Sequence, residues 1–156
     1  MKSVKKIVLG VICVLLIFMA TGCGNKTVMS SNDFKTNMEN KGYVVEDATS
    51  QFEAYGYVSQ VYVAINSGFT YQIEFYELSD TDRAVNFFNN NQSIFEDSKG
   101  SVSSETSVAM GNYSKYTLTT NGMYKVLSRI ENTVIYVNVD EEYKEDVQTI
   151  LEEFGY

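Results

Sequence analysis

The pattern around Asn121-Gly122 constrains the fold of this chain more than any other feature of its sequence. Two strand-like runs, residues 113–120 and 123–130, meet at this dipeptide. Both central residues of a type I′ turn need a positive φ angle, which Asn and Gly adopt more readily than other residues. The sequence therefore predicts an antiparallel β-hairpin over residues 113–130.

A second hairpin is indicated earlier in the chain by alternation of apolar and polar residues. Residues 57–65 and 69–77 have a period of two, and Asn66-Ser67-Gly68 joins them. Two further strands are predicted over residues 101–108 and 133–139.

Three segments have the apolar spacing of amphipathic helices. This spacing predicts helices over residues 30–43, 78–97 and 140–154. The last of these places Val147 and Leu151 on one face, and acidic residues fill its first turn, where the helix dipole favours them.

These elements predict a single α+β domain. An antiparallel sheet with one apolar face can be covered by amphipathic helices, so we expect the three helices to pack mainly on one face. A cone-like sheet wrapped around a helix is an alternative that the sequence leaves open.

The two hairpins also align with each other. Gly56 and Gly111 are each followed by a serine three residues later and by an asparagine ten residues later. We interpret this as a possible internal duplication of a helix-plus-strands unit with a period of 55 residues. The alternative is that two tyrosine-rich hairpins share turn residues by chance.

The first 22 residues have the composition of an export signal. Lys2, Lys5 and Lys6 precede an apolar run of 14 residues (7–20), and two small residues follow before Cys23. A helix needs roughly 20 apolar residues to span a bilayer. The run is therefore short for a permanent anchor, although an uncleaved signal anchor is the alternative reading.

Ala20-Thr21-Gly22-Cys23 resembles the lipobox of bacterial lipoproteins, although that family more often has leucine at the position of Ala20. The resemblance implies that Cys23 carries a diacylglyceryl group and that the chain is cut before it. Two fatty chains hold a protein stably on a bilayer, whereas one does so only marginally. Beyond this motif, the chain resembles small Gram-positive lipoproteins only in general terms.

The lipobox predicts the organisation of the whole chain. We expect a removed signal peptide over residues 1–22, a lipidated tether over 23–32 and a single domain over 33–156. The mature protein would lie at the outer face of the bacterial cytoplasmic membrane, with the lipid bilayer as its first partner.

Charge excludes one class of partner. Without the three lysines of the signal peptide, 9 basic residues face 20 acidic ones, which gives a formal net charge of −11. Binding to phosphates needs clustered Lys and Arg, and such a negative surface is repelled by nucleic acid. We therefore predict no nucleic-acid binding.

The amino-acid composition also excludes most catalytic mechanisms. The chain has no histidine, and no free thiol remains once Cys23 is acylated and Cys13 has left with the signal peptide. The acidic run 140–146 lacks the alternating ligands and central glycine of a calcium loop. We predict no catalytic residue, no metal site and no cofactor, so the chain is not expected to be an enzyme.

Four tyrosines are the candidate binding residues. The assumed strand phase places Tyr62, Tyr76, Tyr113 and Tyr136 together on a sheet face that no helix covers. Tyrosine gives large, rigid contact area at recognition surfaces, but it is also a good strand former with no partner at all.

The favoured function is a non-catalytic binding or accessory module for an envelope protein. An inhibitor or immunity-type protein against a secreted hydrolase is one alternative, and a small hydrolase with two unidentified carboxylates is another.

Overall fold

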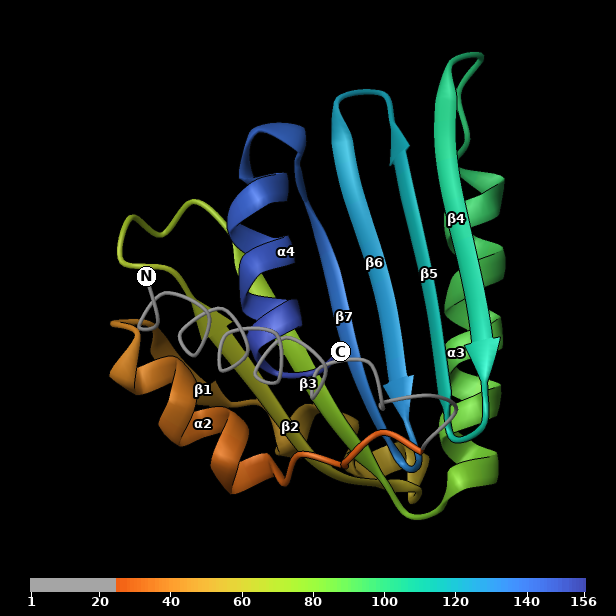
Figure 1. The fold of residues 1–156 in the computed structure, drawn as a ribbon. Coiled ribbons are helices and arrows are strands. Elements are labelled where there is room, and N and C mark those ends of the chain that lie inside the picture. The colour runs from red at the N-terminus through yellow and green to blue at the C-terminus, as the bar shows by residue number, and fades with distance from the viewer. Residues whose placement is uncertain (1–24) are drawn as a thin grey trace, which may run out of the picture.

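The computed structural model describes residues 25–156, so the predicted signal peptide and Cys23 lie outside it (Figure 1). Its helices are α2 (Ser31–Asn40), α3 (Thr81–Asp97) and α4 (Lys144–Glu153), with the 3₁₀ helices η2 (Thr49–Tyr55) and η3 (Glu141–Tyr143). Its strands are β1 (Val44–Asp47), β2 (Val58–Ile65), β3 (Gln72–Leu78), β4 (Ser103–Met110), β5 (Tyr113–Thr120), β6 (Met123–Ile130) and β7 (Thr133–Asp140). Within residues 25–156, none of the helices is both long and apolar enough to cross a membrane.

All seven strands form one antiparallel sheet in the order β1-β2-β3-β7-β6-β5-β4. The predicted hairpin of β5 and β6 is confirmed, since Thr120 pairs with Met123 across the turn. Asn121 and Gly122 have φ angles of 52° and 74°, as a type I′ turn requires. The predicted α+β class and antiparallel sheet are therefore both present.

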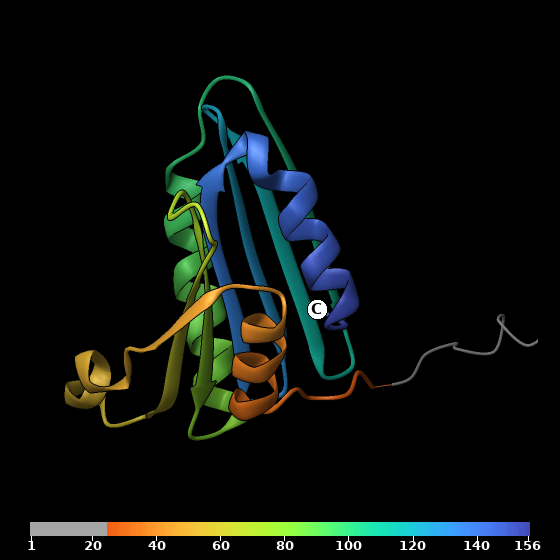
Figure 2. The same ribbon diagram turned by 90° about the vertical axis from the view of Figure 1, so that its left-hand side faces the viewer.

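The helices cover both faces of the sheet (Figure 2). We call the side that α2 and α4 cover the α4 face, and the side that α3 and η2 cover the α3 face. A separate cluster of buried apolar residues fills each side. Two of the three α-helices, α2 and α4, share one face, and α3 packs on the other, where its apolar stripe buries Ala84, Phe88 and Phe95.

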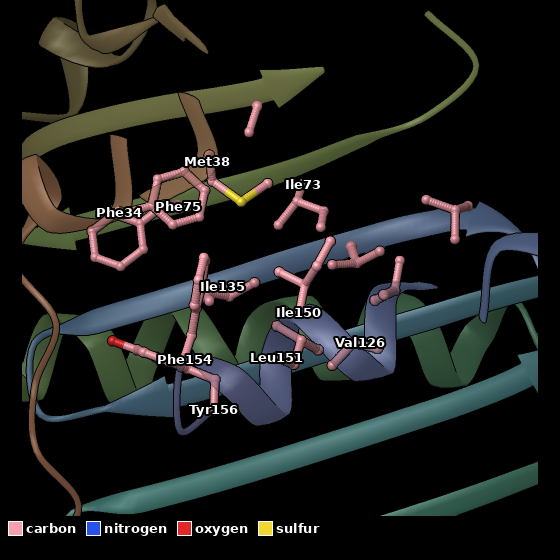
Figure 3. Close-up of a cluster of buried hydrophobic side chains, with 14 of the residues drawn as sticks. Phe34, Met38, Ile73, Phe75, Val126, Ile135, Ile150, Leu151, Phe154 and Tyr156 are labelled. Atoms are coloured by element: carbon pink, nitrogen blue, oxygen red, sulfur yellow. The ribbon is translucent and has the colours of Figure 1, made fainter. Parts of the chain in front are cut away.

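Aromatic contacts hold the α4 face together (Figure 3). Phe34 of α2 stacks on Phe75 of β3 with ring centroids 4.8 Å apart, and Phe154 meets the Phe34 ring edge-on at 6.1 Å. Leu151 of α4 is fully buried in the same cluster. The two helices are thereby fixed to the sheet and to each other.

Residues 25–30, expected to be part of a tether, instead lie against the domain. The backbone of Lys26 exchanges two hydrogen bonds of 2.8 Å with the side chain of Asn112, in the turn between β4 and β5. The Lys26 ammonium group donates to the Gly155 carbonyl and lies 3.5 Å from the centre of the Tyr113 ring. Met29 packs on the buried cluster of the α4 face. We call residues 25–30 the stem.

Strand β4 forms an open edge of the sheet. All eight of its residues are exposed, and it pairs with β5 without a bulge from Ser103 to Met110. An edge strand leaves a row of backbone N–H and C=O groups unpaired. The opposite edge, β1, has only four residues.

The two hairpins proposed as duplicated units differ in their connections. Residues 66–71 join β2 to β3, whereas two residues join β5 to β6. The duplication stays a prediction.

Candidate functional site

The four tyrosines that the sequence groups on one uncovered face do not share a surface. Tyr62 and Tyr113 are 9 % and 7 % exposed and lie on the α4 face. Tyr76, 5 % exposed, lies on the α3 face, where Tyr136 is partly buried against the same cluster. The predicted tyrosine surface is therefore wrong.

Strand pairing explains this difference. Directly paired residues in an antiparallel sheet point to the same side. Tyr62 pairs with Phe75, and Val61 pairs with Tyr76, so neighbouring aromatic residues point to opposite faces. Because helices cover both faces, apolar residues occupy both phases of the alternation, and the sequence pattern alone does not reveal which phase is exposed.

A different aromatic group lines a cleft on the α3 face, between η2 and α3. The cleft has a volume of about 440 Å³. Its lining residues combine aromatic rings, amides and one cation: Phe52, Tyr55, Tyr57, Val58, Arg83, Asn86, Phe87, Asn90 and Asn91. We call it the aromatic cleft.

The aromatic wall comes from η2 and the residues that follow it. Ring centroids of Phe52 and Tyr55 are 6.2 Å apart, and those of Tyr55 and Tyr57 are 5.8 Å apart. Tyr55 is 58 % exposed, so much of its ring is accessible although it lies against two others. Gly56 takes the left-handed conformation that ends η2, with φ 67°, and turns the chain into β2.

Hydrogen bonds hold η2 to the sheet. The Thr49 hydroxyl accepts from the Val61 backbone N–H at 3.0 Å and from the Gln60 amide at 2.7 Å. The Thr49 N–H donates to the Asp47 carboxylate at 2.9 Å, and hydrogen bonds from Thr49 lower the pKa of Asp47. The aromatic wall is therefore built on a fixed turn.

The opposite wall is the first half of α3. The Asp80 side chain caps this helix by accepting from the Arg83 N–H at 2.8 Å, which lowers the pKa of Asp80. Arg83, Phe87 and Asn90 follow at helical spacing and therefore share one face. The Arg83 guanidinium lies 5.3 Å from the centre of the Tyr57 ring, across the cleft.

The amides of this wall differ in their freedom to bind. The Asn91 amide donates to the Phe87 carbonyl at 2.9 Å, so it is already engaged within α3. Among the described residues, Asn86 and Asn90 have no side-chain hydrogen bond, and both are exposed. Two amides and one guanidinium are thus available beside apolar rings.

A second hollow lies on the same face at the other end of β3, with a volume of about 470 Å³. Its walls include Glu74, Tyr136 and Asp140, and the Glu74 carboxylate already accepts from Tyr76 and Gln72. Phe69 also lines this hollow and is 72 % exposed in a turn with φ 55°. This hollow has two carboxylates and no cation among its lining residues.

Within residues 25–156, no three metal-ligating side chains gather at one point. The aromatic cleft contains no carboxylate and no nucleophile with a neighbouring base, so its groups can bind but have no evident reaction to perform.

Sequence reasoning missed this cleft because residues 49–56 fit neither a helical nor a strand period. The signal that could have found it is local: three aromatic residues, Phe52, Tyr55 and Tyr57, fall within six positions. The amide run Asn89-Asn90-Asn91 on α3 was visible as a polar patch, but its aromatic neighbours come from another element.

The chain matches no protein-family model, no curated protein sequence and no solved structure.

Proposed function

We propose that this chain is an extracytoplasmic bacterial lipoprotein whose domain is a non-catalytic binding module. Cys23 carries the lipid anchor, and the aromatic cleft receives a segment of an envelope protein. The observation that carries the binding role is the combination of an exposed tyrosine, two free amides and one arginine around a cleft of about 440 Å³.

The chemistry of the cleft favours a peptide segment as its ligand. Aromatic walls bury an apolar side chain, and tyrosine and arginine are the residue types enriched where binding energy concentrates. The amides of Asn86 and Asn90 can pair with a peptide backbone. Arg83 is the one cation among the lining residues, so it favours a carboxylate next to the apolar side chain.

Two variants test the cleft without disturbing the core. Tyr55→Ala and Arg83→Gln change exposed side chains, and each should reduce recovery of cross-linked partner from solubilised membranes by about tenfold, the effect of losing roughly 1.4 kcal/mol. Ile94→Ala is the matched control, because Ile94 is 61 % exposed on the same helix but outside the cleft.

Each outcome of this comparison has a clear meaning. Loss of the same partner in both cleft variants, but not in the control, supports the proposal. Equal recovery from all three proteins would remove the cleft as the binding site. Recovery of cell-wall glycan in place of protein, lost in the same two variants, would replace the peptide ligand by a carbohydrate.

The anchor has its own test. Cys23→Ser removes the sulfur that would carry the lipid, so we expect the domain to leave the membrane fraction or to stay unprocessed. The domain should still fold, because its two buried clusters lie within residues 25–156. A processed Cys23→Ser protein that remains in the membrane would contradict the lipid anchor.

A further inference from the structure

The stem gives the domain a fixed point of attachment. Paired hydrogen bonds join Lys26 to Asn112, and the Lys26 ammonium group contacts both Gly155 and Tyr113. Asn25 also lies against the chain at Gly111, where an added Cβ would come within 2.8 Å of its side-chain oxygen. The chain therefore leaves the domain at one defined place, beside the turn between β4 and β5.

That place belongs to one end of the sheet. The Glu131 N–H donates to the Asn112 carbonyl at 2.9 Å, and the Leu78 N–H donates to the Asn132 carbonyl at 2.8 Å. These bonds connect the β4–β5 turn, the β6–β7 turn and the end of β3, which leads into α3. We call this the stem end, and the turn at Asn121-Gly122 marks the opposite end.

Lengths decide how far the domain can turn about its anchor. Cys23 precedes Lys26 by three residues, which span at most about 11 Å when fully extended. Strand β5 runs from the stem end to the opposite end through eight residues, or about 26 Å. The sheet is therefore much longer than the segment that separates Cys23 from Lys26.

The end of the sheet away from the stem carries an acidic run. The Glu141 N–H donates to the Gly122 carbonyl at 2.8 Å, which places the acidic run 140–146 at the end away from the stem. Five of the seven residues in this run are acidic. An anionic bilayer surface repels them, so the acidic end is disfavoured next to the membrane.

We propose that the domain stands on the bilayer with its stem end toward the lipid headgroups and its acidic end pointing away. This inference rests on the proposed lipid anchor at Cys23. It also places the first turn of α3, and with it the Arg83 side of the aromatic cleft, near the membrane. The ligand of the cleft is then a protein segment close to the bilayer surface.

The test measures the depth of two exposed positions in the full lipoprotein, reconstituted into vesicles of phosphatidylcholine and anionic phosphatidylglycerol that contain a nitroxide-headgroup lipid. Asp82→Cys places a fluorescent label at the stem end, and Ser67→Cys places it at the opposite end. Labelling is specific because Cys13 leaves with the signal peptide and the Cys23 sulfur is acylated. We expect fluorescence to be lost at position 82 and retained at position 67.

Three results separate the proposals. Absence of the diacylglyceryl mass on the purified protein would refute the anchor itself. With that mass present, equal loss at both positions, or greater loss at position 67, would overturn the orientation while leaving the anchor intact. The double variant Lys26→Ala/Asn112→Ala should reduce the difference between the positions, and an unchanged difference would show that the docked stem does not set the orientation.

Discussion

The buried ring of Tyr76 contacts both walls of the aromatic cleft. The centroid of its ring lies 5.5 Å from that of Phe52 in η2 and 4.7 Å from that of Phe87 in α3. These two residues belong to opposite walls of the cleft. Its hydroxyl donates to Glu74, and burial raises the pKa of Tyr76 well above its ordinary value. This tyrosine therefore spaces the two walls, although it is itself too buried to meet a ligand.

Two substitutions at Tyr76 should separate the ring from the hydroxyl. Tyr76→Phe keeps both aromatic contacts and should lower the free energy of unfolding by about 1.5 to 3 kcal/mol, because the lost hydrogen bond is to a carboxylate. Tyr76→Ala empties a buried aromatic site and should cost about 3 to 5 kcal/mol. Urea unfolding of the two variants measures both values, and equal losses would mean that the ring does not hold the walls apart.

At the level of elements, α4 is the helix whose sequence pattern corresponds most closely to its packing. Val147 and Leu151 are fully buried, as their spacing predicts, while Glu152 is exposed. The helix has no side-chain cap at its start. We therefore attribute its stability to burial of its apolar face against the sheet.

Leu151→Ala should consequently destabilise the domain by about 2 to 5 kcal/mol, the range for emptying a leucine site in a core. Glu152→Gln is the neighbouring control and should change stability by less than about 0.5 kcal/mol. Thermal or urea unfolding gives both numbers. A Leu151→Ala variant as stable as the control would mean that α4 is only loosely docked.

The elements also show which parts of the fold the sequence could predict. Strands β5 and β6 begin and end at the predicted residues because the Asn121-Gly122 turn fixes their register. The four-residue strand β1 and the 3₁₀ helix η2 were missed, since neither is long enough to show a period. The cleft could not be predicted, because its walls are 25 or more residues apart in the chain and meet only through pairing of β2 with β3.

For the whole molecule, the absence of histidine allows a prediction of how folding stability depends on pH. Burial raises the pKa of Tyr116 and of Tyr156 to about 12 in the folded state, compared with about 10 in an unfolded chain. Their contribution to stability is complete below pH 10 and is lost as pH rises toward 12. Hydrogen bonds lower the pKa of Asp47 and Glu105, so their contribution is lost only in acid.

We therefore expect the unfolding free energy to be nearly constant between about pH 6 and 9 and to fall above about pH 10. Three partly buried lysines with lowered pKa values oppose the alkaline fall, but their shifts are smaller. Urea midpoints at half-unit steps of pH measure the profile, and Tyr156→Phe should flatten its alkaline side. A marked change of midpoint between pH 6 and 9 would contradict this account.

The open edge at β4 has a further consequence when many copies are anchored in one membrane. Strand β4 runs toward the stem end, where Met110 leads into the turn at Gly111. In molecules that stand on the same bilayer in the proposed orientation, every β4 strand would run toward the membrane. Two neighbouring β4 strands could then pair only in parallel. This sheet is antiparallel throughout, and parallel pairing is the less stable kind. Anchoring would thus protect the protein against edge-to-edge aggregation, and release from the membrane would remove that protection.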